Sequence, residues 1–189
     1  MGKIILASTS PRRRDILKKS KYNNFEIIPS PYIEDHTMTD FSYEFIEDLA
    51  ANKALAVIPL TKEPSVIIGA DTVVVVDNKI LGKPIDKSDA FKILKKLSGR
   101  THMVVTGIAV INTETHKIKT SASTSKVTFE KLTDEQIKFY IDKYKPLDKA
   151  GSYGIQEMPD GYIKSYIGHL DNIIGLDMNL TERLIEEIL

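Results

Sequence analysis

Short apolar runs alternate along the chain with segments in which apolar residues return every three or four positions. The runs have the length and composition of buried strands, and the longer segments have the periodicity of helices that bury one face. The runs predict strands at 4–7, 25–28, 66–69 with 73–76, 80–81, 103–111, 118–129 and 162–167. The periodicity predicts helices over 42–58, from 86 or 88 to 98, over 133–145 and from 181 onward. This alternation predicts an α/β protein, and because no linker-like segment divides the chain, we expect a single domain over residues 1–189.

Three arginines follow the first predicted strand. Ser10 is a good N-cap and Pro11 suits the first helical position, so Arg12, Arg13 and Arg14 fall in or near the first turn of a helix. Cations at this end oppose the helix dipole, at a cost of about 0.3–1 kcal/mol each at an exposed site, and a bound anion offsets that cost. The pattern favours a phosphate site, with a solvated basic face or a nucleic-acid patch as the alternative.

An acidic residue interrupts the most apolar predicted strand. Asp71 lies in the segment Gly69-Ala70-Asp71-Thr72, between two runs of branched apolar residues. A buried carboxylate without a partner is costly, so such a residue usually has a cationic or metal partner or lies at the mouth of an active site. A bulge or bend beside Gly69 is the structural alternative, and we favour the functional interpretation.

Three further segments carry polar groups that suit a ligand. Lys53 lies on the apolar stripe of the predicted 42–58 helix, where its amine reaches either a cleft or the solvent. Lys83 follows a predicted strand, and taken by itself it is better interpreted as a surface lysine. Residues 148–156 contain two glycines and Gln156, which offers the donor and acceptor that a nucleobase edge requires. Taken alone, that segment is better interpreted as a plain turn.

The composition narrows the class of protein. Lys and Arg number 26 and Asp and Glu number 26, so the formal charge is zero, which counts against a general binder of nucleic acid polymers. The chain has no cysteine, which excludes disulfides, thiolate catalysis and cysteine-ligated zinc, and its four histidines lack metal-ligand spacing. No apolar run approaches the roughly 20 residues that span a bilayer, so we expect a cytoplasmic protein with no membrane partner.

In order along the chain, these segments resemble the Maf family of nucleoside triphosphate pyrophosphatases. The matching segments are residues 6–13, 69–72, 81–84, 97–102, 148–156 and 171–176. They extend over nearly the whole chain, and the ordered set is specific although each segment is short. The resemblance implies a mixed twisted sheet with flanking helices, in two lobes around a central cleft, and often a homodimer. It also implies hydrolysis of a nucleoside triphosphate between the α- and β-phosphates, with Mg²⁺ or Mn²⁺ as the divalent cation.

The resemblance assigns roles to individual residues. Asp71 would activate water as the general base, and Glu34 would help to carry the metal, with Asp35 as the alternative ligand. The residues that would hold the phosphates are Ser8, Arg12, Arg13, Lys53 and Lys83. Arg12, Thr72 and Gln156 match the subgroup that resembles dTTP/UTP pyrophosphatases, whereas the subgroup acting on 7-methyl-GTP tends to carry Trp in place of the first Arg. We therefore expect dTTP and UTP as substrates, with modified uridine or cytidine triphosphates as further candidates.

Two positions depart from the family pattern. Glu157 follows Gln156 where glycine is common, and Asp177 follows Leu176 where proline is common. Both lie near the expected base pocket. The alternative function is a non-catalytic nucleotide-binding regulator of cell division, which binding without turnover would distinguish from an enzyme.

Overall fold

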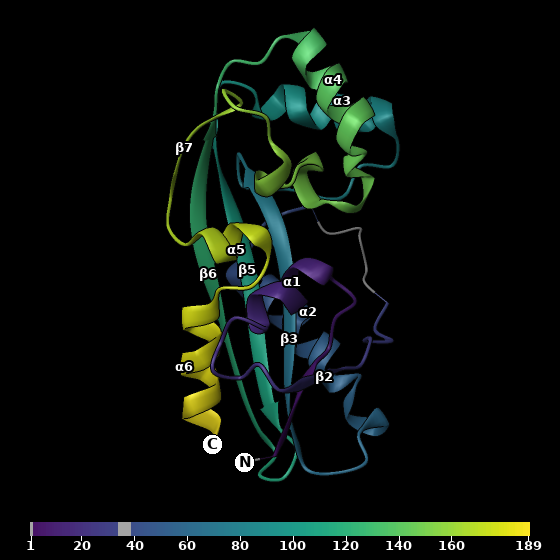
Figure 1. The fold of residues 1–189 in the computed structure, drawn as a ribbon, viewed down its shortest axis with the longest axis vertical. Coiled ribbons are helices and arrows are strands. Elements are labelled where there is room, and N and C mark those ends of the chain that lie inside the picture. The colour runs from purple at the N-terminus through teal and green to yellow at the C-terminus, as the bar shows by residue number, and fades with distance from the viewer. Residues whose placement is uncertain (1, 34–38) are drawn as a thin grey trace.

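The computed structural model describes residues 2–33 and 39–189, which form a seven-stranded mixed sheet with helices on both faces (Figure 1). The strands are β1 (Lys3–Leu6), β2 (Phe25–Ile27), β3 (Ser65–Val76), β4 (Lys79–Leu81), β5 (Thr101–Asn112), β6 (Lys117–Phe129) and β7 (Ile163–Ile167). The strand order is β2-β1-β3-β5-β6-β7, and β4 also pairs with β3. β1 runs parallel to β2 and β3, whereas β3, β5, β6 and β7 are antiparallel neighbours.

Helices and short 3₁₀ turns connect and cover these strands. The helices are α1 (Pro11–Leu17), α2 (Tyr43–Leu55), α3 (Lys87–Leu97), α4 (Asp134–Tyr144), α5 (Leu170–Ile174) and α6 (Met178–Ile188). The 3₁₀ turns are η1 (Ile58–Leu60), η2 (Pro146–Asp148), η3 (Ala150–Ser152) and η4 (Ile155–Glu157). The helices α3 and α4 gather at one end of the sheet, and α1, α2 and α6 cover the other end (Figure 1).

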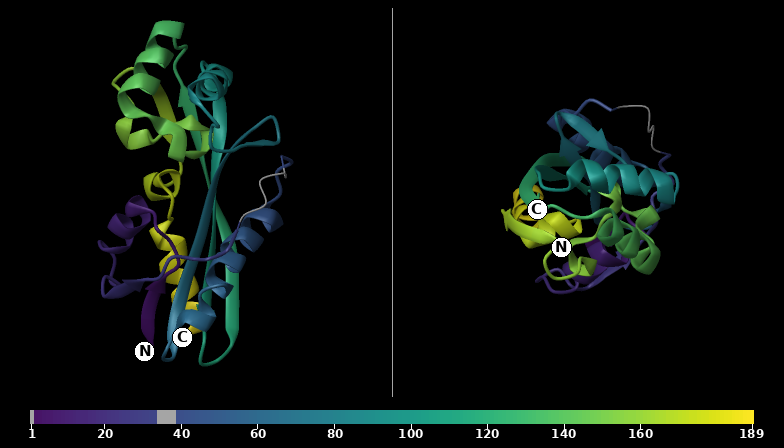
Figure 2. Two further views of the ribbon diagram at one scale, coloured as in Figure 1. Left: turned by 90° about the vertical axis from the view of Figure 1, so that its right-hand side faces the viewer. Right: turned by 90° about the horizontal axis from the view of Figure 1, so that it is seen from above.

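The helices at the second end lie on opposite faces of the sheet, as Figure 2 shows for α2 against α1 and α6. Neighbouring residues of β3 confirm this arrangement, because successive side chains of a strand point to opposite faces. Ile67 packs with Ala54 of α2, whereas Ile68 packs in the cluster that contains Leu17 of α1 and Ile185 of α6. The mixed sheet with flanking helices is therefore confirmed, and the two groups of helices correspond to the two expected lobes.

Two glycines allow α2 to pack close to the sheet. A Cβ atom on Gly69 of β3 would lie 2.2 Å from the carbonyl oxygen of Ala50, and a Cβ atom on Gly107 of β5 would lie 2.3 Å from that of Ile46. A side chain at either position would collide with the helix backbone. The two glycines thus bring α2, and Lys53 with it, against the middle of β3.

Most predicted elements are present, and several begin at the predicted caps. Ser42, Asp86 and Thr133 cap α2, α3 and α4, and Asp86 is the first of the two starts that the sequence left open for α3. Thr133 forms a capping box with Gln136. The strand β3 runs through Asp71 with a regular register against β5, so the bulge that the sequence left open is not formed.

The predicted start of the C-terminal helix at Thr181 is wrong. The helix α6 begins at Met178, because the buried side chain of Asp177 accepts a hydrogen bond from the N–H of Leu180 and caps the helix. Thr181 lies inside the helix and donates its hydroxyl to the carbonyl of Asp177. The helix α5 is not predicted either, since its 5 residues are too few to show a helical period.

Candidate active site

Asp71 lies where one edge of β3 has no neighbouring strand. The strand β5 pairs with β3 along the other edge over nearly its whole length. On the first edge, β1 pairs as far as Ile68, and the pairing with β4 begins at Val74. Between these two pairings, no described strand lies beside residues 69–73. Unpaired N–H and C=O groups at such an edge are hydrogen-bonding groups that a ligand can use.

The side chain of Asp71 forms an ion pair with Lys53. Both side chains are largely buried, with 10% of Asp71 and 12% of Lys53 exposed. Of the two orientations that the sequence left open for Lys53, the amine therefore points toward the sheet. The ammonium group compensates the charge of the buried carboxylate. An ionised carboxylate has about four acceptor sites, so this one partner leaves capacity for a proton or a metal ion.

Arg13 connects α1 to β3 and to the turn after α5. Its Nε donates to the carbonyl oxygen of Gly175 at 2.9 Å, and its Nη2 donates to the hydroxyl of Thr72 at 3.1 Å. Its Nη1 lies 3.4 Å from the hydroxyl oxygen of Ser8, which also accepts the N–H of Ser10. The structure thus brings Ser8, Arg13 and Thr72 together, and these contacts fix the plane of the guanidinium group.

These two clusters lie on opposite faces of β3. Asp71 and Thr72 are consecutive residues of a regular strand, so their side chains point to opposite sides of the sheet. The Lys53–Asp71 pair faces α2, whereas the contact between Arg13 and Thr72 faces α1 and α5. Both clusters belong to the part of β3 whose edge is free, so a ligand that touches both lies across that edge. The cleft that the resemblance implies at this place stays a prediction.

The three consecutive arginines have different partners. Arg12 reaches Asp148, with 3.4 Å between its Nη1 and the Oδ2 of that carboxylate. Arg14 pairs with its exposed neighbour Asp15 and does not join the cluster around Arg13. The three arginines therefore face different partners, and the phosphate site predicted from them stays a prediction.

Two further predicted ligands lie toward the end that carries α3 and α4. Lys83 is exposed just after β4, and Gln156 is exposed in η4. The carbonyl of Gly82 accepts the N–H of Gly151 at 3.0 Å, which joins the segments that carry these two residues. Within the described parts of the chain, neither Lys83 nor Gln156 is hydrogen-bonded to Asp71.

Lys149 is a buried cation beside this region that sequence reasoning missed. Its side chain is 8% exposed, and its Nζ lies 2.9 Å from Asp148 Oδ1 and 3.2 Å from Glu157 Oε2. Burial by itself raises the pKa of Asp148, but the hydrogen bond from Lys149 and the charges of Lys149 and Arg12 hold that pKa below its usual value. In the sequence, Lys149 stands beside an acid in a glycine-containing segment. A plain turn explains that pattern equally well, so the pattern does not predict a buried lysine.

The expected metal ligands Glu34 and Asp35 lie outside the described residues. Over residues 2–33 and 39–189, no group of three or more His, Cys, Asp or Glu side chains could hold a metal ion. Mg²⁺ is commonly bound by one or two carboxylates together with waters and substrate phosphate oxygens. Asp71, a carboxylate at the free edge of β3, fits a metal of this kind, to which the substrate contributes ligands.

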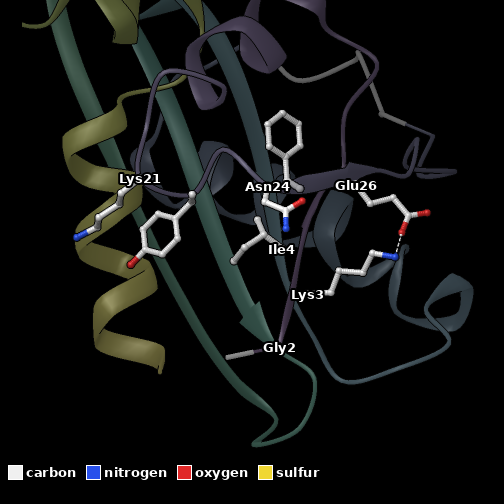
Figure 3. Close-up of a pocket in the computed structure, with 8 residues that line it drawn as sticks. Gly2, Lys3, Ile4, Lys21, Asn24 and Glu26 are labelled. Atoms are coloured by element: carbon white, nitrogen blue, oxygen red, sulfur yellow. Dashed lines mark ion pairs between the residues drawn. The ribbon is translucent and has the colours of Figure 1, made fainter.

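A hollow of about 570 Å³ lies at the end of β1 remote from Ser8 (Figure 3). Its lining includes two lysines, and each is already paired. The Nζ of Lys3 lies 2.5 Å from Oε2 of Glu26, and Lys21 forms an ion pair with Glu186 of α6. Because neighbouring acids neutralise these cations, the hollow lacks the positive charge that a triphosphate requires, and we do not place the site there.

Comparison with known proteins assigns the chain to a family. The family model described as Maf-like protein matches residues 3–188, so the chain belongs to the Maf family. A protein named dTTP/UTP pyrophosphatase from Clostridium botulinum (strain Eklund 17B) is 40% identical over 186 residues, which is 98% of each chain. The protein of that name from Clostridium perfringens (strain 13) is 41% identical over 187 residues, covering 97% of this chain and 96% of the relative. The protein of that name from Thermoanaerobacter sp. (strain X514) is 41% identical over 177 residues, covering 94% of this chain and 92% of the relative.

Solved structures share the fold at much lower identity. The Ham1 protein of Staphylococcus aureus superposes with a TM-score of 0.52 at 15% identity, covering 98% of each chain. The HAM1 protein of Coxiella burnetii gives a TM-score of 0.50 at 18% identity, covering 98% of this chain and 100% of that one. These similarities confirm the fold class and do not bear on the substrate.

Proposed function

We propose that this chain hydrolyses dTTP and UTP between the α- and β-phosphates, giving the nucleoside monophosphate and pyrophosphate. The observation that carries the proposal is the buried Lys53–Asp71 pair at the free edge of β3. It occurs in a chain whose relatives at about 40% identity are named dTTP/UTP pyrophosphatase. Phosphoryl transfer needs a positioned base and cations around the phosphate oxygens, and the residues at this edge are of those types.

In this proposal Asp71 accepts a proton from the attacking water. The water oxygen bonds to the α-phosphorus, the bond to the oxygen bridging the α- and β-phosphates breaks, and pyrophosphate leaves with that oxygen. Lys53 holds the Asp71 carboxylate in place through its ion pair. On the other face of β3, Arg13 and Ser8 bind phosphate oxygens, and the carbonyl of Gly175 keeps the guanidinium group oriented.

The outer parts of the substrate are bound by residues of α1, of the segment after β4 and of η4. Arg12 and Lys83 bind the remaining phosphate charge, and a phosphate competes with Asp148 for the guanidinium group of Arg12. Gln156 is exposed and offers one acceptor and two donor hydrogens to the edge of a pyrimidine base. Thr72 supports Arg13 by accepting its hydrogen bond.

A divalent cation, Mg²⁺ or Mn²⁺, belongs to this proposal. When bound, it would neutralise part of the triphosphate charge that otherwise repels the carboxylate. Asp71 is the described residue that would hold it, and Glu34, with Asp35 as the alternative, stays the expected second ligand.

The proposed partners are the nucleotide and a second copy of the chain. The zero formal charge supports a small anionic ligand over a nucleic acid polymer. No helix in the part of the chain that the structure describes has the length and apolar character needed to cross a membrane. The homodimer is proposed from the family resemblance, and light scattering on the purified protein tests it. The cytoplasmic location is proposed as the sequence analysis gave it.

The test is a panel of common and modified nucleoside triphosphates with Mg²⁺, read out as pyrophosphate release. We expect dTTP and UTP to be the best common substrates, and Asp71→Asn to lower kcat by about 10²–10⁴-fold, the usual contribution of a general base. Asp142→Asn is the matched control, because Asp142 forms an exposed ion pair with Lys87 on α3. Tight binding without turnover for every nucleotide and metal would favour the regulator over the enzyme.

A further inference from the structure

The loop that carries Gln156 is closed by a buried lysine. The Nζ of Lys149 lies 2.9 Å from Asp148 Oδ1 and 3.2 Å from Glu157 Oε2, and 8% of the lysine side chain is exposed. The two acids stand at the two ends of residues 148–157. The buried side chain of Lys149 therefore joins the ends of this loop through two ion contacts.

Hydrogen bonds hold the middle of the same loop. The N–H of Gly154 donates to the hydroxyl of Tyr140 at 3.1 Å, and the N–H of Gly151 donates to the carbonyl of Gly82 at 3.0 Å. Gly154 also lies against the stem of Lys149, since a Cβ atom on this glycine would be 3.2 Å from Lys149 Cε. Tyr140 is a fixed anchor, because it lies in the core with 1% of its surface exposed.

Glu157 depends on Lys149 more than Asp148 does. The Oε2 atom of Glu157 is buried and makes no hydrogen bond within the described residues, so its compensation is the charge of Lys149. The side chain of Asp148 is 64% exposed and also meets Arg12. Without the carboxylate of Glu157, Lys149 keeps one acidic partner, Asp148, and Asp148 is shared with Arg12. The 155–157 turn then loses its ion contact with Lys149 and keeps the hydrogen bond from the N–H of Glu157 to the carbonyl of Gly154.

The position of that turn matters because of what Gln156 has to distinguish. Thymine and uracil present O4 as an acceptor, whereas cytosine presents the N4 amino group as a donor. A glutamine amide carries an acceptor and a donor at the end of one plane, and rotating the plane exchanges them. A freely rotating Gln156 therefore satisfies either base. Selection requires the amide to meet the base in one orientation, and the position of the Gln156 backbone sets which side-chain orientations reach the base.

We propose that Glu157 is a specificity-determining positioning residue. Through its contact with Lys149 it fixes the 155–157 turn, and so presents the Gln156 amide in the orientation that accepts 4-oxo pyrimidines over 4-amino pyrimidines. Glu157 itself does not touch the base in this account. The inference deepens the proposed function and rests on it.

The test compares the wild-type chain with Glu157→Ala, Glu157→Gln and the control Glu186→Ala. Glu186 also pairs with a lysine, Lys21, but on the exposed surface of α6 away from the loop. Steady-state kcat and KM are measured for dTTP and dCTP through pyrophosphate release, and the melting temperature reports folding. We expect Glu157→Ala to raise KM for dTTP about tenfold with kcat within about twofold of wild type. The ratio of kcat/KM for dTTP over dCTP should fall about tenfold.

The controls separate positioning from loss of structure. Glu157→Gln keeps an oxygen that accepts from Lys149 and should recover part of the dTTP preference, and Glu186→Ala should match wild type. An unchanged dTTP/dCTP ratio in Glu157→Ala overturns the proposal, as does an equal fall in kcat for both nucleotides. If Glu157→Ala does not fold, Glu157→Met decides, because it removes both carboxylate oxygens at similar side-chain length, and a wild-type ratio in that variant overturns the proposal. Should the wild-type chain release no pyrophosphate from any triphosphate, the proposed function fails and this inference falls with it.

Discussion

The close packing of α2 on β3 allows a sharp prediction for Gly69→Ala. A Cβ atom at this position would lie 2.2 Å from the carbonyl oxygen of Ala50 and 2.9 Å from the Cβ atom of Ala54. The first of these atoms is helix backbone, which cannot rotate away. Ordinary contact begins at 3.4 Å, so the shortfall is 3.4 − 2.2 = 1.2 Å. We expect α2 to move away from the sheet by about that distance.

The displacement separates the two halves of the candidate active site. Lys53 lies on α2 close to Ala50 and moves with the helix, whereas Asp71 lies on β3 and stays. A misplacement of about 1 Å costs about a hundredfold in rate when it affects catalytic geometry. Overpacking of this kind costs about 1–3 kcal/mol of unfolding free energy, and each kcal/mol lowers Tm by about 2–4 °C in a chain of this size.

The assay measures kcat for pyrophosphate release from dTTP beside the melting temperature. Gly99→Ala is the matched control, because Gly99 has φ +70° and lies after α3, and the nearest atoms to a Cβ there are 3.7 Å away. That variant loses stability through backbone strain, by about 1 kcal/mol, without displacing α2. We expect Gly69→Ala to lose about a hundredfold in kcat and Gly99→Ala to keep its rate. Equal rates in the two variants at equal loss of Tm would refute the reasoning.

Three further predictions follow from single contacts. Arg13→Lys keeps the charge but loses the guanidinium fork, so KM for dTTP should rise about tenfold, and an unchanged KM would contradict the role of Arg13. Asp177→Ala removes the N-cap of α6 and should lower the unfolding free energy by about 1 kcal/mol or more in chemical denaturation. Burial lowers the pKa of His102 from 6.5 to about 4, so the unfolded chain binds more protons between these values. The unfolding free energy should therefore fall by about 3 kcal/mol as the pH drops from about 6.5 to 4, and His102→Gln should flatten this dependence; equal slopes would contradict it.

The elements that the sequence predicts best are those with both a local cap and a continuous apolar stripe. The helices α2, α3 and α4 meet both conditions. The helices α2 and α4 begin where predicted, and α3 begins at the first of the two starts left open. The helix α6 is missed at its start because Asp177 is fixed by distant groups as well as by the helix. One carboxylate oxygen of Asp177 contacts the hydroxyl of Ser123 and Nδ1 of His169. The residues next to Asp177 in the sequence do not predict these contacts.

The candidate site also has one part that the sequence predicts and one part that depends on how distant elements pack. The segments that carry Ser8, Arg13 and Thr72 are recognisable in the sequence because each is a compact motif, and the structure brings them into contact. The pairing of Lys53 with Asp71 depends on how α2 crosses β3, which two glycines allow, so the sequence alone left the direction of Lys53 open. The placement of the two clusters on opposite faces of β3 follows from strand alternation once that strand is known to be continuous.

Phosphorus NMR of the products formed from dTTP and Mg²⁺ in isotopically labelled water tests the central claim most directly. The account predicts dTMP and pyrophosphate in equal amounts, with the label in dTMP, and almost no product from Asp71→Asn in the same time. Formation of dTDP and orthophosphate, or undiminished turnover by Asp71→Asn, would contradict it.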